Sequence, residues 1–303
     1  MMFITAESPS PRPTAVAMGL FDGLHLGHQA VIRAAAACAP TLTPAVFTFQ
    51  FDAPDMATKP DFARILSPAY KLKLLAEMGV EGICSPNFSE ICGLSPAAFF
   101  EELLVKTMKA EAVFCGYDFH FGKNAEGDGV MLANMCKTHG IAFCQLPAAS
   151  DSVGPISSTR IRAALQSGEM EEAAALMGRP YALCAEVVHG RHMGREVFGF
   201  PTINQLYEEG SLLPRFGVYE SRTVIGGKAF RGVTNVGIKP TVGGSAPAAE
   251  THILGFDGDL YGRQPLVEFL RFMRGEKKFS SFEALKAQIC RDAAEVSGKP
   301  DGN

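Results

Sequence analysis

The chain has 303 residues, of which 47% are hydrophobic and 20% are charged, a composition typical of soluble globular proteins, and this length favours two domains. The formal net charge of −4 argues against a broad nucleic-acid-binding surface, because such a surface needs a strongly basic face. No apolar run reaches the ~18 residues of a membrane span, and the N-terminus lacks the basic and apolar regions of a signal peptide.

Up to about residue 178, segments typical of strands alternate with segments typical of helices. Strand-like apolar runs lie at 14–18, 45–49, 111–115 and 141–146. Helical patterns lie at 24–38, 67–78, 96–108 and 129–139. Strands separated by helices build βαβ units, so residues 1–179 are expected to form an α/β domain with a doubly wound parallel sheet covered on both faces.

The turn after the first strand, residues 19–28 (GLFDGLHLGH), is the most informative segment of this domain. A helix N-terminus exposes unpaired N–H groups and the positive end of the helix dipole, so it attracts phosphate. Gly23 and Gly27 let the backbone approach a ligand, and His25 and His28 lie three residues apart on one helical face, where both can donate to phosphate oxygens. Paired histidines can also bind metal, but no cysteine or acidic residue follows at zinc-ligand spacing. The turn therefore predicts a nucleotide site.

Two further segments of the first domain carry polar groups that suit a nucleotide. Residues 116–122 (GYDFHFG) follow a predicted strand, which places them at the same sheet edge as the histidine turn, although a glycine-bounded loop with aromatic packing explains them equally well. Residues 156–162 (ISSTRIR) open a helix with three hydroxyls and two arginines. Ordinary capping needs only one serine, so these groups favour a triphosphate.

After residues 178–180 (GRP), short strand-like runs are punctuated by glycine, and this pattern predicts a small antiparallel β-barrel or sandwich for residues 180–303. The runs lie at 182–188, 217–224, 232–236, 250–254 and 266–271. A final helix is expected near 280–296, because Ser280 and Ser281 with Glu283 beyond them resemble a helix start.

The second domain also carries a glycine loop, residues 190–195 (GRHMGR), followed by GFPTIN at 199–204. The side-chain oxygens of Thr202 and Asn204 are hard ligands that suit Mg²⁺ bridged to phosphate. Glycine and proline in such a segment can equally mark a corner of a barrel, so the residues alone leave both interpretations open.

Together these motifs resemble the bacterial bifunctional riboflavin kinase/FMN adenylyltransferase (FAD synthetase) family over residues 14 to 290. In the first domain, F-D-G-x-H-x-G-H, G-x-D-F-x-F-G and I-S-S-T-x-I-R stand at 21–28, 116–122 and 156–162. In the second, G-x-x-x-G-R, G-F-P-T-x-N, G-V-Y, N-x-G-x-x-P-T and E-x-H-I stand at 190–195, 199–204, 217–219, 235–241 and 250–253. The resemblance implies a nucleotidyltransferase domain followed by a riboflavin kinase β-barrel. It further implies that ATP with Mg²⁺ converts riboflavin to FMN and then FMN to FAD plus pyrophosphate.

The resemblance also implies roles for individual residues. His25 and His28 would stabilise charge on the α-phosphate, while Glu250 would take the proton from the ribityl 5′-hydroxyl. Thr202 and Asn204 would hold the metal and the ATP phosphates. The remaining nucleotide-binding residues would be Gly19, Phe21, Asp22, Gly23, Asp118, Ser157, Ser158, Thr159, Arg162, Gly190, Gly194 and Arg195. The closing R-x-E-K-x-F pattern at 274–279 suggests a structural role or support for a flavin lid.

Some positions depart from the family pattern, mainly around FMN and phosphate in the first domain. Leu20 stands where asparagine is usual, residues 49–54 (FQFDAP) replace a P-H-P element, and residues 123–128 (KNAEGD) replace two arginines followed by G-D. Alternatives are therefore a riboflavin kinase with weak or absent adenylyltransferase activity, or a non-catalytic flavin-binding protein. A nucleotidyltransferase acting on another small molecule, such as pantetheine phosphate, is disfavoured by the kinase motifs of the second domain.

The eight cysteines are scattered, form no C-x-x-C pair and lie partly within apolar runs, which predicts reduced thiols in a cytosolic protein. We therefore expect a cytoplasmic location, with ATP, riboflavin and FMN as the binding partners and neither nucleic acid nor membrane among them. The sequence indicates no oligomeric state.

Overall fold

The computed structural model describes residues 1–51, 63–188, 202–241 and 244–298, with the backbone alone at 239–241 and 244. The chain divides into two compact units, Met1–Ala63 with Pro68–Ser158, and Arg64–Ser67 with Thr159–Asn303. Two helices, α7 (Ser158–Ser167) and α8 (Met170–Met177), therefore belong almost wholly to the second unit by their contacts. The domain boundary expected between residues 179 and 180 would assign them to the first domain, and it stays a prediction.

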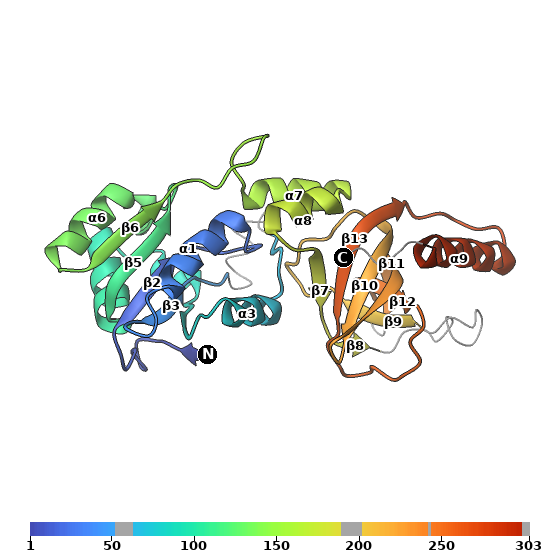
Figure 1. Cartoon of the computed structure of the whole chain (residues 1–303), viewed down its shortest axis with the longest axis horizontal. Coiled ribbons are helices and arrows are strands. Elements are labelled where there is room, and N and C mark those ends of the chain that lie inside the picture. The colour runs from blue at the N-terminus through green and yellow to red at the C-terminus, as the bar shows by residue number, and fades with distance from the viewer. Residues whose placement is uncertain (52–62, 189–201, 242–243, 299–303) are drawn as a thin grey trace. The chain divides into compact units, whose positions relative to one another are not determined.

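The first unit is built on six parallel strands in the order β1-β4-β3-β2-β5-β6 (Figure 1). The strands are β1 (Met2–Phe3), β2 (Thr14–Met18), β3 (Thr43–Phe47), β4 (Gly82–Cys84), β5 (Ala110–Gly116) and β6 (Ala142–Leu146). Strands β2 and β3 are buried at every residue, as expected for central strands covered on both faces. The chain winds outward from β2 in both directions, so the order reverses between β2 and β5, and ligands of such sheets bind at that point.

The helices of the first unit cover this sheet and build one apolar core with it. They are α1 (Leu26–Ala36), α3 (Pro68–Glu77), α4 (Phe88–Ile91), α5 (Pro96–Phe99), the π-helical η1 (Phe100–Thr107), the short 3₁₀ turn η2 (Lys123–Ala125) and α6 (Gly129–Thr138). Helix α1 packs against β2, β3 and β5. Phe100, Leu104 and Met108 are at most 1% exposed and join the core beside Val113 of β5. The α/β class expected for this half is confirmed.

Two details of the first sheet differ from the predicted pattern. The strand expected at 45–49 lies at Thr43–Phe47, where its pairing with β2 ends at Met18 opposite Phe47. Strands β1 and β4 were not predicted, since two and three residues are too few to form an apolar run of strand length.

The second unit is a seven-stranded antiparallel half-barrel in the order β7-β13-β10-β11-β12-β9-β8 (Figure 1). Its strands are β7 (Tyr181–Cys184), β8 (Val187–Val188), β9 (Thr202–Leu206), β10 (Gly217–Ile225), β11 (Lys228–Thr241), β12 (Gly244–Ile253) and β13 (Leu266–Arg274). Every neighbouring pair is antiparallel, and the final helix α9 (Phe282–Ser297) packs on β11. The expected antiparallel β domain with a C-terminal helix is confirmed, but the run at 182–188 is two short strands.

A short segment from early in the chain completes this second unit. The N–H of Arg64 donates to the carbonyl of Gly210 at 2.8 Å, and the N–H of Leu212 donates to the carbonyl of Arg64 at 2.8 Å. Arg64 thereby forms a parallel bridge with Ser211, 147 positions further along the chain. The polypeptide consequently passes from one unit to the other three times, at 63–64, 67–68 and 158–159.

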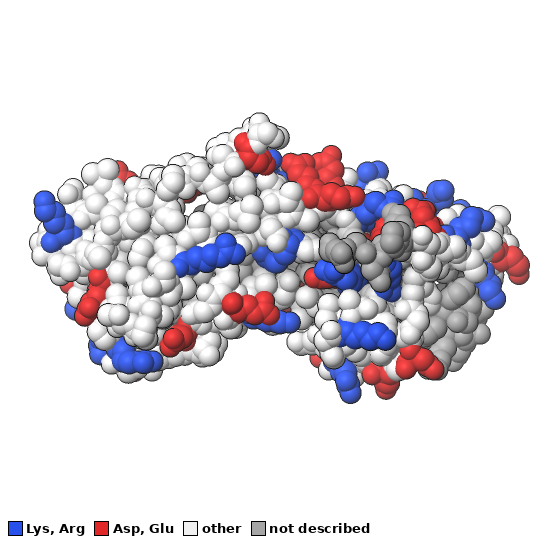
Figure 2. Space-filling model, in the orientation of Figure 1, with Lys and Arg blue, Asp and Glu red and all other residues white. Residues whose placement is uncertain are grey.

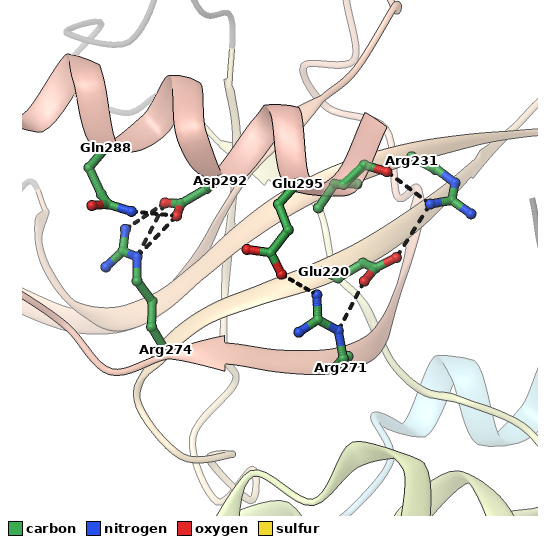
Figure 3. Close-up of polar contacts among 8 residues, drawn as sticks. Glu220, Arg231, Arg271, Arg274, Gln288, Asp292 and Glu295 are labelled. Carbon is green, nitrogen blue, oxygen red and sulfur yellow. Dashed lines mark hydrogen bonds and ion pairs between the residues drawn. The ribbon is translucent and has the colours of Figure 1, made fainter. Parts of the chain in front are cut away.

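Ion pairs fasten α9 to the half-barrel (Figure 3). Arg274 of β13 donates to Asp292 of α9 at 2.7 Å, and the two side chains are only 16% and 6% exposed. Glu220 of β10 accepts from Arg271 at 3.2 Å and lies 3.5 Å from Arg231. The guanidinium of Arg274 thus holds the final helix, which is the structural role considered for the R-x-E-K-x-F pattern.

Removing the Asp292 carboxylate should destabilise the second unit strongly. Asp292→Ala leaves Arg274 buried without its counter-charge, and breaking a buried pair in this way costs about 3 kcal/mol or more. Glu295→Ala is the matched control on the same helix, because the Glu295 side chain is 53% exposed and its pair with Arg271 is worth under about 1 kcal/mol. Denaturant unfolding of both variants measures the free energy of unfolding that each has lost relative to the wild type. Equal losses in the two variants would contradict the larger role given to the Arg274–Asp292 pair.

The surface carries mixed charge, with acidic and basic side chains interspersed over the face seen in Figure 2. Among the described residues, no helix is both long enough and apolar enough to cross a membrane.

Candidate active sites

The first candidate site is the tight turn between β2 and α1. Phe21, Gly23 and Leu24 have positive φ angles of 53°, 79° and 46°, which fold the chain sharply before the helix begins. His25 is the N-cap of α1, and its Nδ1 accepts the backbone N–H of His28 at 3.3 Å. A capping histidine satisfies only one N–H of the first turn, so other donors of this turn remain for a ligand. The turn therefore has the strand–turn–helix form that the phosphate-site prediction assumes, and phosphate binding itself stays a prediction.

The two histidines of this turn stack on each other. Their ring centroids lie 3.6 Å apart with an interplanar angle of 20°, and the Phe21 ring meets His28 edge-on at 5.3 Å. Nδ1 of His28 is buried and has no hydrogen-bond partner among the described residues. Burial, reinforced by His25 and Lys71, lowers the pKa of His28 well below its usual value, so this imidazole is neutral at neutral pH. A bound phosphate would favour its protonation.

The other segments predicted for nucleotide binding reach the same turn to different extents. Strands β2 and β5 are neighbours, with Met18 opposite Cys115, so the turn after each strand lies at one sheet edge, and Asp118 is exposed in the second turn. Oγ of Ser158 donates to the carbonyl of Asp22 at 2.8 Å, although the two residues are 136 positions apart. Ser157 directly precedes Ser158, the first residue of α7. Thr159 and Arg162 follow on the same helix and belong to the second unit.

Glycine is favoured at two of these positions by close packing. At Gly19 a Cβ would lie 3.0 Å from the Phe21 ring, and at Gly27 it would lie 3.2 Å from the His25 ring. Both distances are tighter than ordinary van der Waals contact, so the absent side chains let the aromatic and imidazole rings take their positions.

Lys71 of α3 is a residue of this site that the sequence patterns did not single out. Its Nζ donates to the carbonyl of Leu20 at 2.7 Å and to Oγ1 of Thr48 at 2.9 Å. Burial lowers the pKa of Lys71 to about 8, partly opposed by Asp22. The sequence feature that could have identified Lys71 is its spacing. It precedes the fully buried Leu75 by four residues and therefore lies on the inward face of the helix.

The second candidate site lies across three strands of the half-barrel. The register places Glu250 of β12 directly opposite Asn204 of β9 and opposite Asn235 of β11. Residues directly opposite in a sheet share one face, so these three polar side chains stand side by side. Oγ1 of Thr202 donates to Oε1 of Glu250 at 3.1 Å. Asn235 was quoted within a motif but not proposed as a site residue; the strand register adds it.

The chemistry of this group fits a magnesium ion and its phosphate ligands. A hydroxyl, an amide and a carboxylate supply the hard oxygen donors that Mg²⁺ prefers. The Thr202 hydroxyl donates its hydrogen bond to Glu250, which leaves the lone pairs of the hydroxyl oxygen available to a metal ion. The predicted nucleotide-binding residues Gly190, Gly194 and Arg195 lie outside the described residues.

Comparison with known proteins identifies a family for each half of the chain. Two family models match the chain, FAD synthetase over residues 7–160 and riboflavin kinase over residues 177–298. The bifunctional riboflavin kinase/FMN adenylyltransferase of Escherichia coli K12 is 34% identical over 280 residues, covering 91% of this chain and 89% of the relative. The protein of the same description from Listeria monocytogenes is 35% identical over 297 residues, covering 95% and 93%.

A solved structure shares the fold along its whole length. The crystal structure described as a macrolide-efflux protein from Streptococcus pneumoniae superposes with a TM-score of 0.84 at 30% identity, covering 99% of this chain and 100% of that one. The fold, the two family models and the full-length relatives lead to one conclusion: the chain belongs to the bifunctional riboflavin kinase/FMN adenylyltransferase family.

Proposed function

We propose that the second unit phosphorylates riboflavin at the Thr202–Asn204–Glu250 group, and that the first unit adenylylates the resulting FMN at the turn before α1. Riboflavin kinase and FMN adenylyltransferase are the two activities of the family. The observation that carries the proposal is the presence in one chain of a histidine-rich helix N-terminus and a separate carboxylate–hydroxyl–amide group on antiparallel strands.

At the adenylyltransferase site, a phosphate oxygen of FMN attacks the α-phosphorus of ATP, and the bond from that phosphorus to the β-phosphate oxygen breaks. Pyrophosphate leaves, and no covalent enzyme intermediate is needed. His25, His28 and the N–H groups of α1 stabilise charge on the α-phosphate, because fixed donors are already aimed at the position where charge develops. The β- and γ-phosphates are held by the hydroxyl and guanidinium groups of Ser157, Ser158, Thr159 and Arg162. The nucleotide is bound by Gly19, Phe21, Asp22, Gly23 and Asp118.

At the kinase site, Glu250 takes the proton from the ribityl 5′-hydroxyl, whose oxygen attacks the γ-phosphorus of ATP while ADP leaves. The carboxylate lies on a rigid strand beside the residues that would hold the metal, Thr202 and Asn204, and a general base must be positioned in this way. Mg²⁺ held there would neutralise charge on the transferred phosphoryl group. Gly190, Gly194 and Arg195 complete the proposed nucleotide contacts.

The proposed binding partners are small molecules, namely ATP, riboflavin and FMN, and the proposed location is the cytoplasm. All eight cysteines are free thiols, and thiols persist in a reducing compartment.

A time course with purified protein tests the proposed function. Riboflavin is incubated with ATP and Mg²⁺, and the flavins are separated by chromatography. FMN and ADP should appear first, and FAD with pyrophosphate should follow as FMN accumulates. FMN without FAD would favour the riboflavin kinase alternative, and bound flavin with neither ADP nor pyrophosphate would favour a non-catalytic flavin-binding protein.

A further inference from the structure

Lys71 brings a partly buried positive charge to the histidine turn of the first unit. Its ammonium group is fixed by the carbonyl of Leu20, which belongs to that turn, and by the hydroxyl of Thr48 at the end of β3. Leu20 contributes through its backbone, so the side chain at position 20 does not decide this contact. Lys71 is close enough to His28 for its charge to lower the pKa of that imidazole.

The hydrogen bonds of Lys71 are not needed to complete the turn. Oγ1 of Thr48 itself donates to the Leu20 carbonyl at 2.8 Å, so this acceptor is already satisfied by a neutral, almost fully buried hydroxyl. A lysine in this place adds a charge that must be taken out of water, which is costly. A structural role therefore accounts poorly for a charged residue here.

The charge of Lys71 also lacks a direct counter-charge. Within the described part of the chain, no carboxylate forms an ion pair with Nζ, and Asp22 acts only from a distance. Two of the three ammonium N–H groups are used by Leu20 and Thr48, so one is left without a described partner. An anionic ligand would supply both the missing acceptor and the missing charge.

We propose that Lys71 is a further catalytic residue of the adenylyltransferase site, whose ammonium group contacts the triphosphate of ATP beside His28 and stabilises the negative charge that develops as pyrophosphate leaves. The inference rests on the adenylyl transfer proposed above. In that step the FMN oxygen–phosphorus bond forms, the bond from the α-phosphorus to the bridging oxygen breaks, and pyrophosphate takes the electron pair. Lys71 keeps its proton throughout.

The test compares Lys71→Met and Lys71→Arg with Lys73→Met, a matched control. Lys73 lies two residues further along the same helix and is exposed. FAD formation from supplied FMN is measured against ATP concentration, and riboflavin kinase activity of the same samples reports on folding and concentration. We expect Lys71→Met to lower kcat/KM for FAD formation about 100-fold or more, the usual loss when one preorganised donor is removed. Lys71→Arg should recover part of this loss, and Lys73→Met should match the wild type.

A pH profile gives a second readout that a structural role would not produce. Because the pKa of Lys71 is about 8, kcat/KM of the wild type for ATP should fall as the pH rises through about 8 and the ammonium loses its proton. Lys71→Arg should lack this decline, since guanidinium stays charged. Among the described residues, Asp22 and His28 are the ionisable groups that act on Lys71 or respond to it. Thr48, the residue after β3, is neutral, and His28 is already neutral above pH 7.

The outcomes separate this inference from the proposed function. If the wild type forms no FAD, the proposed adenylyl transfer fails first. If the wild type forms FAD and Lys71→Met matches Lys73→Met, Lys71 is not catalytic. If Lys71→Met fails to fold, the pH profiles of kcat/KM of the wild type and Lys71→Arg provide the test. A decline near pH 8 in both proteins would overturn the inference. A decline in the wild type that is absent from Lys71→Arg would support it.

Discussion

We expect His28→Ala to abolish the formation of FAD from FMN and ATP while the same protein continues to convert riboflavin to FMN. The imidazole is stacked on His25 at the start of α1, where a phosphate would meet the helix dipole and the unpaired N–H groups. Removing a donor preorganised for the transition state typically costs about 100- to 1,000-fold in kcat. The kinase site belongs to the other compact unit, so its rate should stay unchanged. Separate assays with FMN and with riboflavin as substrates measure both effects.

The control for this variant is His139→Ala, in the same unit. His139 pairs with Glu101 at the surface, 2.8 Å from its carboxylate, and takes no part in the proposed site. Its removal should leave both reactions near the wild-type rate. Loss of both activities in folded His28→Ala would contradict the picture of two independent sites, and unchanged FAD formation would remove His28 from the mechanism.

Glu250→Ala should give the reverse pattern, with FMN formation lost and FAD formation from supplied FMN retained. A positioned general base contributes about 100- to 10,000-fold, and here the carboxylate also anchors the hydroxyl of Thr202. Glu250→Gln keeps the size and an acceptor oxygen but cannot take a proton, so it should be nearly as inactive. Steady-state rates of ADP release with riboflavin provide the measurement.

Glu186→Gln serves as the matched control, because Glu186 is an exposed carboxylate between β7 and β8 of the same unit. An active Glu250→Gln would show that the proton leaves by another route. Normal riboflavin kinase activity in Glu250→Ala would place the kinase site elsewhere.

The adenylyltransferase turn could be predicted from sequence because its parts are contiguous. An apolar strand, a glycine turn and a helix carrying His25 and His28 follow one another within 15 residues, from Thr14 to His28, and the parallel direction of the strands follows from the βαβ rule. Contacts between distant segments could not be predicted in this way. Ser158 reaches Asp22 across 136 positions, and Lys71 reaches Leu20 across 51, in both cases through a backbone carbonyl that no side-chain pattern records.

The kinase site, too, could be predicted from sequence only in part. Glu250, Thr202 and Asn204 were proposed from motifs, but only the register of β9, β11 and β12 sets Asn235 beside Glu250. Strand β9 escaped prediction because its residues, TINQL, mix polar and apolar side chains without a clear alternation.

The bridge from Arg64 to Ser211 bears on how the protein could be divided into independent genes. A polypeptide beginning at residue 180 would carry the half-barrel strands and α9 but would lack Arg64, whose backbone hydrogen-bonds with Gly210 and Leu212. The complementary N-terminal fragment would keep Arg64 without the partner it pairs with. The two units are therefore interlaced in the order of their residues, and splitting the reading frame at a single point would leave a bridging segment of the second unit encoded with the first.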